Sequence, residues 1–277
     1  MTKTARPRAL ILCADDYALH PLIDEAVEQL ALAGRLSATS CMTTALRWPQ
    51  AAARLRALRP RLSVGLHFNL TESHGGSVPA QGLSTVICQA YARQWSQAAL
   101  RARWQQQLDA FEQALGTAPD FIDGHQHVHQ LPGVRAAMLA ELQARYAPRQ
   151  LPWVRSTLPA GGLWRSSKAA VIALLGGWAS TRGLRQAGVA QNRGFGGIYG
   201  FDAHDPEAYG AQMAQWLPQL GAASLVMCHP ATRLLPGDAI GDQRPVEFAY
   251  LRSEAFGALL AQQNMQVAQG PLHHLLR

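Results

Sequence analysis

The sequence has little lysine and no long apolar run. Lys3 and Lys168 are its two lysines, so arginine carries most of the net charge of +7. The basic first residues precede a short apolar stretch that ends in two aspartates, which is typical of a strand and not of a signal peptide. No apolar run approaches the length that a membrane span requires. We therefore expect a cytoplasmic protein without a membrane-spanning segment.

Cysteines and nucleotide-binding motifs are also scarce. The four cysteines lie far apart and form no Cys-x-x-Cys pair, which predicts small core residues in a reducing compartment and neither disulfides nor zinc ligands. They are Cys13, Cys41, Cys88 and Cys228. The sequence contains no G-x-x-x-x-G-K-[ST] loop and no G-x-G-x-x-G after a predicted strand, so a nucleotide cofactor is not expected.

Acidic residues are nearly missing from the middle of the chain. Between Gly124 and Phe201 the only acid is Glu141. The same stretch carries the basic residues Arg135, Arg145, Arg149, Arg155, Arg165, Lys168, Arg182, Arg185 and Arg193. Such a segment fits a surface for an anionic substrate, a phospholipid or nucleic acid, and it equally fits an ordinary solvated face. No recognised nucleic-acid motif interleaves these arginines with aromatic residues, so we expect no nucleic-acid partner.

The order of apolar stretches predicts strands that alternate with helices. Strands are expected over 8–13, 37–43, 62–68, 120–123, 153–157, 224–228 and 265–268, and helices over 23–33, 48–58, 96–115, 132–146, 163–184, 206–217 and 253–262. Loops over a site are expected at 72–86 and 192–199. This alternation favours a parallel sheet with right-handed crossovers, and the length suits one (β/α) barrel domain spanning residues 1–277.

Histidines gather in the segment DGHQHVH at 123–129. If this segment is extended, Asp123 and the three histidines His125, His127 and His129 share one face. Imidazole is the commonest metal-binding side chain, and a neighbouring carboxylate can either bind the metal or accept the second ring N–H. The alternative is a histidine-rich surface tract. His127 and His129 are candidates either to replace or to support His125.

Two adjacent carboxylates, Asp15 and Asp16, follow the first predicted strand. They repel each other unless a positive charge lies between them, and a metal ion would supply that charge. His67, His125 and His229 also lie at the C-terminal ends of predicted strands, each a different one. In a (β/α) barrel the carboxyl ends of all strands open on one rim, where such barrels place their chemistry. The sequence therefore predicts a metal site at this rim.

The residue types at this rim indicate a hydrolase for an amide or ester. One or two carboxylates with two imidazoles suit a metal that activates water, and this ligand set favours zinc or another transition ion over magnesium. If Asp16 binds the metal, Asp15 can accept a proton from the water. His229 could then protonate the leaving group.

Four motifs in register carry a resemblance to a known family. They are Ala14-Asp15-Asp16-Tyr17, VGLHFNLT at 64–71, DGHQHVH at 123–129 and Met227-Cys228-His229-Pro230. With them the chain resembles the YdjC-like carbohydrate deacetylases, the ChbG and HpnK type, over almost its whole length. The resemblance implies a distorted (β/α), TIM-like barrel and metal-dependent removal of an acetyl group from an N-acetylated sugar. It also implies a metal, usually described as magnesium, on Asp16, His67 and His125, Asp15 as base, His229 as acid, and a homodimer.

The chain departs from the family in the segment after the aspartate pair. The family usually has Phe-Gly-Leu-Ser, where this chain has Tyr17-Ala18-Leu19-His20. The substrate therefore need not be a chito-oligosaccharide, and the basic middle segment adds the hypothesis of a phosphate-bearing or lipid-linked sugar. Arg244 and Glu247 fit either a structural ion pair or a substrate contact. Trp153 and Trp164 are candidates for stacking on a sugar ring.

Two other functions fit the same residues. One is a metal-dependent phosphoesterase acting on a sugar phosphate, which the arginines suggest. The other is a catalytically silent barrel that binds carbohydrate without turning it over. The first would release phosphate without acetate, and the second would bind sugar equally well after Asp15→Asn.

Overall fold

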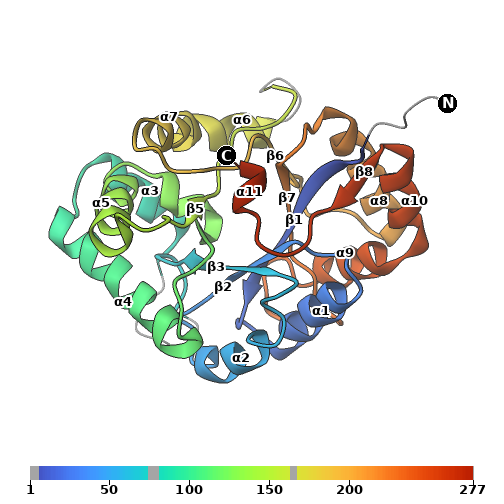
Figure 1. The fold of residues 1–277 in the computed structure, drawn as a ribbon, viewed down its shortest axis with the longest axis horizontal. Coiled ribbons are helices and arrows are strands. Elements are labelled where there is room, and N and C mark those ends of the chain that lie inside the picture. Colours follow the sequence, from blue (N-terminus) through green and yellow to red (C-terminus); the bar gives the residue numbers. More distant parts are fainter. Residues whose placement is uncertain (1–5, 74–80, 163–166, 277) are drawn as a thin grey trace.

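A curled parallel sheet surrounded by helices forms the centre of the protein (Figure 1). The computed structural model describes residues 6–73, 81–162 and 167–276. Its strands are β1 (Arg8–Tyr17), β2 (Ala38–Cys41), β3 (Ser63–Phe68), β4 (Phe121–Gly124), β5 (Trp153–Val154), β6 (Phe195–Gly196), β7 (Ser224–Cys228) and β8 (Met265–Val267). They lie in the order β5-β4-β3-β2-β1-β7-β6, and β8 pairs with β1 off this path.

The two outer strands of this path approach each other. Single parallel bridges join Val154 to Gln191 and Pro159 to Phe195, so the segments after β5 and before β6 meet. All of the described strand pairs are parallel. The arrangement confirms the predicted distorted (β/α) barrel, in which the closure between β5 and β6 is the irregular part.

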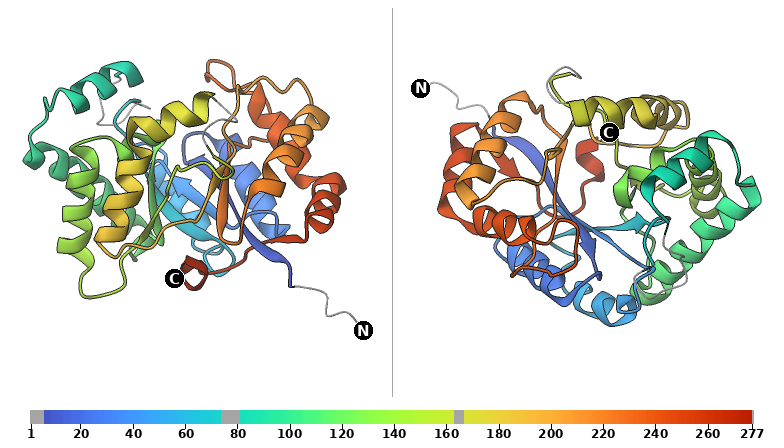
Figure 2. Two further views of the ribbon diagram at one scale, coloured as in Figure 1. Left: turned by 90° about the horizontal axis from the view of Figure 1, so that it is seen from above. Right: turned by 180° about the vertical axis from the view of Figure 1, so that it is seen from behind.

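The helices cover the outside of the curled sheet, as the two further views show (Figure 2). They are α1 (Pro21–Leu32), α2 (Trp48–Leu55), α3 (Leu83–Tyr91), α4 (Gln97–Leu115), α5 (Val134–Tyr146), α6 (Ser167–Ile172), α7 (Trp178–Gln186), α8 (Pro206–Trp216), α9 (Gln243–Arg252), α10 (Glu254–Gln262) and α11 (His273–Leu276). Short 3-10 turns span His125–Gln130 and Leu217–Gln219. None of the described helices is both long and apolar enough to cross a bilayer.

Alternation along β1 divides the core into two clusters. Leu10, Leu12 and Ala14 pack in the large cluster between the sheet and its helices, whereas Ile11 and Cys13 belong to a smaller one. Successive side chains of a strand point to opposite faces, so a strand buried on both faces must be apolar throughout. The smaller cluster includes residues of β1, β4, β5, β6 and β7 and is joined by α11.

The predicted helix over 163–184 is interrupted in the structure. The described part consists of α6, a π-helical segment at Ala173–Gly177, and α7. Gly176 has φ 129°, and a Cβ there would lie 2.5 Å from the carbonyl oxygen of Gln130. The chain therefore needs glycine where it passes the turn that follows β4.

Other elements also differ from the prediction. Helix α3 lies partly inside the predicted loop over 72–86, and residues 74–80 of that loop are outside the described residues. Strand β6 lies inside the predicted loop over 192–199, and α9 was not predicted. Short strands such as β6 and helices with mixed composition give weak periodic patterns, which explains these omissions.

Candidate active site

The aspartate pair lies at a bulge near the end of β1. The pairing of β1 with β2 shifts register between Ala14 and Tyr17, and Asp16 has φ 69°. An extra residue in a strand changes the direction of the side chains beside it, and aspartate tolerates positive φ better than most residues. Because of the bulge, the side chains of Asp15 and Asp16 contact different partners, although they are adjacent and both buried.

Asp16 lies together with His67 at the end of β3 and His125 just after β4. Asp16 Oδ1 is 3.5 Å from His67 Nε2 and 3.2 Å from His125 Nδ1. One ligand atom from each residue lies within 4.8 Å of the others. Asp16 Oδ1 is buried and accepts no well-formed hydrogen bond within the described part of the chain. Two atoms that bind one ion at about 2.1 Å lie roughly 3.0–3.4 Å apart, so this spacing fits a metal.

The outer nitrogen of each imidazole meets a carboxylate. His67 Nδ1 donates to Asp123 Oδ1 at 2.6 Å, and His125 Nε2 donates to Glu72 Oε1 at 3.0 Å. Each of these bonds directs the other ring nitrogen toward Asp16. Metal-binding histidines commonly use such a bond to fix the tautomer and the ring orientation. Asp123 therefore orients the imidazole of His67 at the site.

The carboxylates around His67 and His125 favour the protonated, positively charged form of both imidazoles. Burial alone would lower the pKa of His67, but the Asp123 carboxylate outweighs it and raises that pKa to about 10. Burial likewise acts to lower the pKa of His125, while the neighbouring carboxylates of Asp16 and Glu72 raise it to about 9. The same electrostatic field would stabilise a bound cation.

Asp15 is held by Arg155, which lies inside the predicted strand over 153–157 and directly follows β5 in the structure. Arg155 Nη1 donates to Asp15 Oδ2 at 2.7 Å, and Arg155 Nη2 also pairs with Asp123 Oδ2 at 2.5 Å. Burial acts to raise the pKa of Asp15, but the Arg155 guanidinium holds it well below its ordinary value. Ser40 Oγ adds a hydrogen bond to Asp15 Oδ1 at 3.1 Å. Asp15 is thus an ionised carboxylate.

A second group of potential metal ligands surrounds the guanidinium of Arg155. Cys13, Asp15 and Asp123 also place one ligand atom each within 4.8 Å of the others. Arg155 contacts all three, with Nη2 at 3.1 Å from Cys13 Sγ. A guanidinium therefore fills the place that a metal would need in this group.

Another arginine, Arg244, compensates the negative charge of Asp16. Arg244 Nη2 donates to Asp16 Oδ2 at 2.8 Å and to Asp238 Oδ2 at 2.9 Å. Arg155 and Arg244 thus supply the positive charge that the adjacent carboxylates require. The expected positive charge is therefore present without a metal, and the argument for a metal depends on the geometry of Asp16, His67 and His125.

His229 follows β7 and lies across the rim from His125. Its Nε2 is 3.9 Å from Asp15 Oδ2, and its backbone N–H donates to Glu247 Oε2 at 2.6 Å. Phe201 contacts the imidazole edge-on, with 5.3 Å between ring centroids. Burial lowers the pKa of His229 to about 4, although Asp15 acts to raise it. Arg244 and Glu247 form no ion pair with each other. Arg244 instead donates to Asp16, and Glu247 accepts from the backbone of His229.

The histidine segment is not extended as expected. Strand β4 ends at Gly124, and the chain then turns through His125–Gln130, with positive φ at Gln126 and His127. A Cβ on Gly124 would lie 2.8 Å from the backbone nitrogen of His129, so this tight turn requires glycine. The turn sends the histidines in different directions, and only His125 joins Asp16 and His67.

His127 and His129 have separate environments. His127 lies edge-on to Phe195, with ring centroids 5.6 Å apart, and burial holds its pKa well below the ordinary value. His129 Nε2 donates to the carbonyl oxygen of Arg155 at 3.0 Å. His129 therefore helps to position the backbone of the arginine that holds Asp15.

The basic middle segment does not form one face. Arg155 is fully buried at the site, and Arg145 pairs with Asp109, Glu112 and Glu141. Arg165 lies outside the described residues, as does Trp164. Trp153 is also fully buried and stacks on Phe121, so it cannot stack on a sugar.

Sequence reasoning missed three residues of the site. The sequence places Arg155 in a basic segment that fits a surface, Glu72 in a predicted loop, and Ser40 inside a predicted strand without further signal. The only available signal was position, because Arg155 and Ser40 each lie inside a predicted strand. Because a buried charge is costly without a partner, a charged residue inside a predicted strand is a candidate site residue, like one directly after the strand.

Comparisons with known proteins identify relatives of this chain. The family described as YdjC-like protein matches residues 9–262. A human carbohydrate deacetylase is 31% identical over 185 residues, which cover 61% of this chain and 56% of the relative. A chitooligosaccharide deacetylase of Serratia marcescens is 31% identical over 153 residues, which cover 52% of this chain and 59% of the relative. The chain spans about half the length of the curated relatives that it matches.

A solved structure has a similar fold. It is that of a candidate cellobiose-phosphate cleavage protein of Enterococcus faecalis V583, with a TM-score of 0.67 and 19% identity. The similarity covers 95% of this chain and 97% of the other. At this level of identity the comparison supports the fold, which agrees with the distorted barrel.

Proposed function

Since the chain belongs to the YdjC-like protein family, we propose that it is a metal-dependent carbohydrate deacetylase, which removes an acetyl group from an N-acetylated sugar. The observation that carries the proposal is the cluster of Asp16, His67 and His125 beside Asp15 and His229. One catalytic domain spanning residues 1–277 and a homodimer are part of the same proposal.

The metal would be held by Asp16, His67 and His125. Their spacing supports this assignment, as does Asp16 Oδ1, which is buried and faces both imidazoles without a well-formed hydrogen bond among the described residues. A divalent ion bound there, magnesium or zinc, lowers the pKa of water and polarises a carbonyl oxygen. Two imidazoles in the ligand set favour zinc, whereas the family resemblance favours magnesium.

Asp15 would accept the proton of the attacking water. Arg155 keeps this carboxylate ionised and fixes its orientation through two guanidinium nitrogens. A general base must be correctly placed before its pKa matters, and Asp15 is adjacent to the metal ligand Asp16. Arg155 also holds Asp123, so one buried cation orients the base and the partner of His67 together.

His229 would deliver a proton to the leaving amine. It is neutral near pH 7 in the absence of substrate, because burial lowers its pKa to about 4. Its Nε2 lies 3.9 Å from Asp15 Oδ2, so the proton that Asp15 accepts has a short path to the imidazole. An amine is a poor leaving group without such a proton.

The rival phosphoesterase has less support at the rim. The two arginines closest to the metal cluster, Arg155 and Arg244, are each paired with carboxylates and would not be available to a phosphate. A silent binding barrel is also disfavoured, because the candidate base, acid and ligands lie together.

Acetate release tests the proposal. The protein reconstituted with zinc or magnesium would be incubated with neutral, phosphorylated and lipid-linked N-acetylated sugars. We expect acetate from at least one of them, and a loss of roughly 10²–10⁴-fold in rate after Asp15→Asn with the metal still bound. His125→Ala should lose both metal and rate. No acetate from metal-loaded protein, or full activity of Asp15→Asn, would contradict the proposal; phosphate release would favour the phosphoesterase.

A further inference from the structure

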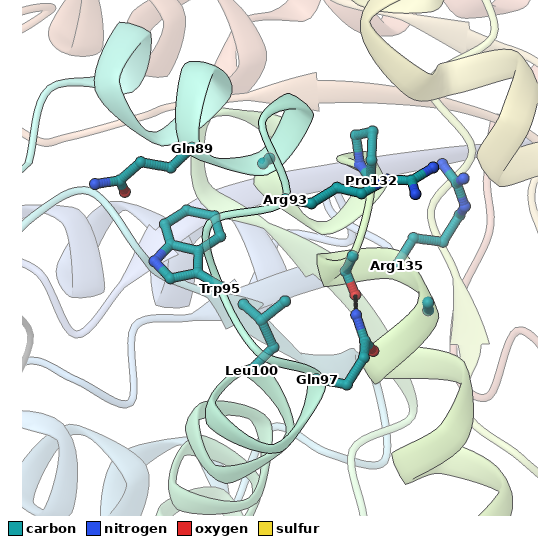
Figure 3. A pocket seen from close by; sticks show the side chains of 10 residues that line it. Gln89, Arg93, Trp95, Gln97, Leu100, Pro132 and Arg135 are labelled. Atoms are coloured by element: carbon teal, nitrogen blue, oxygen red, sulfur yellow. Dashed lines mark hydrogen bonds between the residues drawn. The ribbon is translucent and has the colours of Figure 1, made fainter.

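A pocket lies beside the rim, outside the cluster of candidate catalytic residues. It is formed where α3 ends and where α4 and α5 begin, and its volume is about 480 Å³ (Figure 3). The lining residues are Gln89, Ala90, Arg93, Trp95, Gln97, Leu100, Pro132, Gly133, Arg135 and Ala136. Helix α5 follows the turn that carries His125, so the pocket and the candidate active site share one side of the barrel.

Two arginines meet in this pocket without an acid. The side chains of Arg93 and Arg135 reach toward each other in Figure 3, and no aspartate or glutamate is among the lining residues. Arg135 Nη1 donates to the carbonyl oxygen of Gln130 at 2.7 Å, which orients its guanidinium. Within the described residues, Arg93 makes no ion pair. Two like charges that approach each other are stabilised by an anion between them.

Burial increases the need for such an anion. Arg135 is half-buried, and burial lowers its pKa, with only Tyr91 acting in the opposite direction. A buried cation is costly unless it is paired. Other arginines of the chain, such as Arg145 and Arg244, have carboxylate partners, whereas this pair leaves its charge directed into a cavity.

The turn at Arg93 does not depend on the arginine side chain. It follows the end of α3 with φ 54°, a left-handed conformation that glycine usually adopts after a helix. Arginine at this position costs conformational energy that glycine would not. The guanidinium is therefore not required for the turn.

An aromatic ring and two amides also line the pocket. Trp95 is half-buried with its indole near Leu100 and Gln89, whereas Gln97 lies on the side of Arg135 (Figure 3). Gln97 Nε2 donates to the carbonyl oxygen of Gly133 at 3.4 Å. An apolar ring with a few polar groups suits a ligand that is apolar on one face and hydroxylated at its edges.

We propose that this pocket binds an anionic saccharide unit, with its oxyanion between Arg93 and Arg135 and its ring against Trp95. Guanidinium groups recognise phosphate and carboxylate oxygens through several donors at once. The proposal concerns binding and does not depend on the acetyl chemistry at the rim.

Isothermal titration with non-acetylated probes tests this binding site. Glucose 6-phosphate, inorganic phosphate and glucose would be titrated into the full chain, with and without a chelator, so that binding to a metal is separated. We expect glucose 6-phosphate to bind more tightly than inorganic phosphate, and glucose not to bind measurably. Arg93→Gly and Arg135→Gln should each weaken binding roughly tenfold to hundredfold. Arg182→Gln, on the exposed side of α7, and Asp15→Asn should not.

The variants also separate binding from folding. Because glycine suits the left-handed position, Arg93→Gly should keep or raise the thermal unfolding midpoint while it loses binding. Binding that is equal in wild type, Arg93→Gly and Arg135→Gln would overturn the proposal, as would the absence of binding by glucose 6-phosphate. Inorganic phosphate that binds as tightly as the sugar phosphate would overturn the saccharide part. Neither result would bear on acetate release.

Discussion

At the scale of single residues, His229 gives a test of the proposed division between base and acid. We expect His229→Ala to slow hydrolysis of an N-acetyl sugar by roughly 10²–10⁴-fold, because an amine leaves poorly without a proton. Hydrolysis of an activated acetyl ester should fall much less, because its leaving group needs no proton. The measurement is the ratio of kcat/KM for the two substrates. Equal losses on both would count against His229 as the acid.

Arg155 gives a second residue-scale prediction, on stability. Arg155→Gln leaves Asp15 and Asp123 buried without their shared cation, and such a change typically costs about 3–5 kcal/mol in the free energy of unfolding. Urea unfolding of the variant and the wild type measures this difference. The exposed Arg182 supplies a matched control, because Arg182→Gln should change stability by no more than about 0.5 kcal/mol. Similar values for both variants would contradict the assigned role of Arg155.

At the scale of elements, regular segments were predicted better than the turns between them. The prediction for α4 was accurate because Ser96 caps its start and Gly116 ends it in a left-handed conformation, and both residues leave a local signal. The turn after β4 has no such signal, because Gln126 and His127 adopt positive φ only in the folded context. The predicted alternation of histidines failed for this reason, although His125 was placed at the rim correctly.

The contact between β3 and β4 gives a prediction at this scale. Gly65 pairs with Phe121, and a Cβ on Gly65 would lie 2.5 Å from the Phe121 ring. We expect Gly65→Ala to cost about 1–3 kcal/mol, because the ring must shift within a packed core. Gly221→Ala is the control, since no described atom lies within 4 Å of its added Cβ. Thermal and urea unfolding of the two variants should therefore differ clearly, and equal stabilities would show that the ring moves at little cost.

At the scale of the whole molecule, the chain order alone allowed the barrel and its rim to be predicted. Asp16, His67, His125 and His229 lie at or directly after the carboxyl ends of different strands, and parallel strands bring those ends together. Their electrostatic partners could not be predicted in the same way. Arg244 lies more than two hundred positions from Asp16, and only the fold brings the two together.

Glu247 forms hydrogen bonds to residues from distant parts of the sequence, and its titration makes the stability of the fold depend on pH. It lies on α9 and accepts hydrogen bonds from Tyr199 and from the backbone of His229. Burial raises its pKa from 4.5 to about 7, although these bonds and Arg244 act to lower it, and Asp15 acts to raise it. The folded state therefore favours the protonated acid. Its contribution to stability is present below the ordinary pKa and is lost as pH rises through about 7.

Glu247→Gln removes this titration while keeping the shape of the side chain. The amide can accept from the backbone N–H of His229 and donate to the Tyr199 hydroxyl. The free energy of unfolding of the variant, relative to wild type, should thus rise by up to about 3 kcal/mol between pH 4.5 and pH 8. Urea unfolding at several pH values measures the difference directly. A difference that stays constant over this range would show that Glu247 is ionised throughout, held by Arg244 and its two hydrogen bonds.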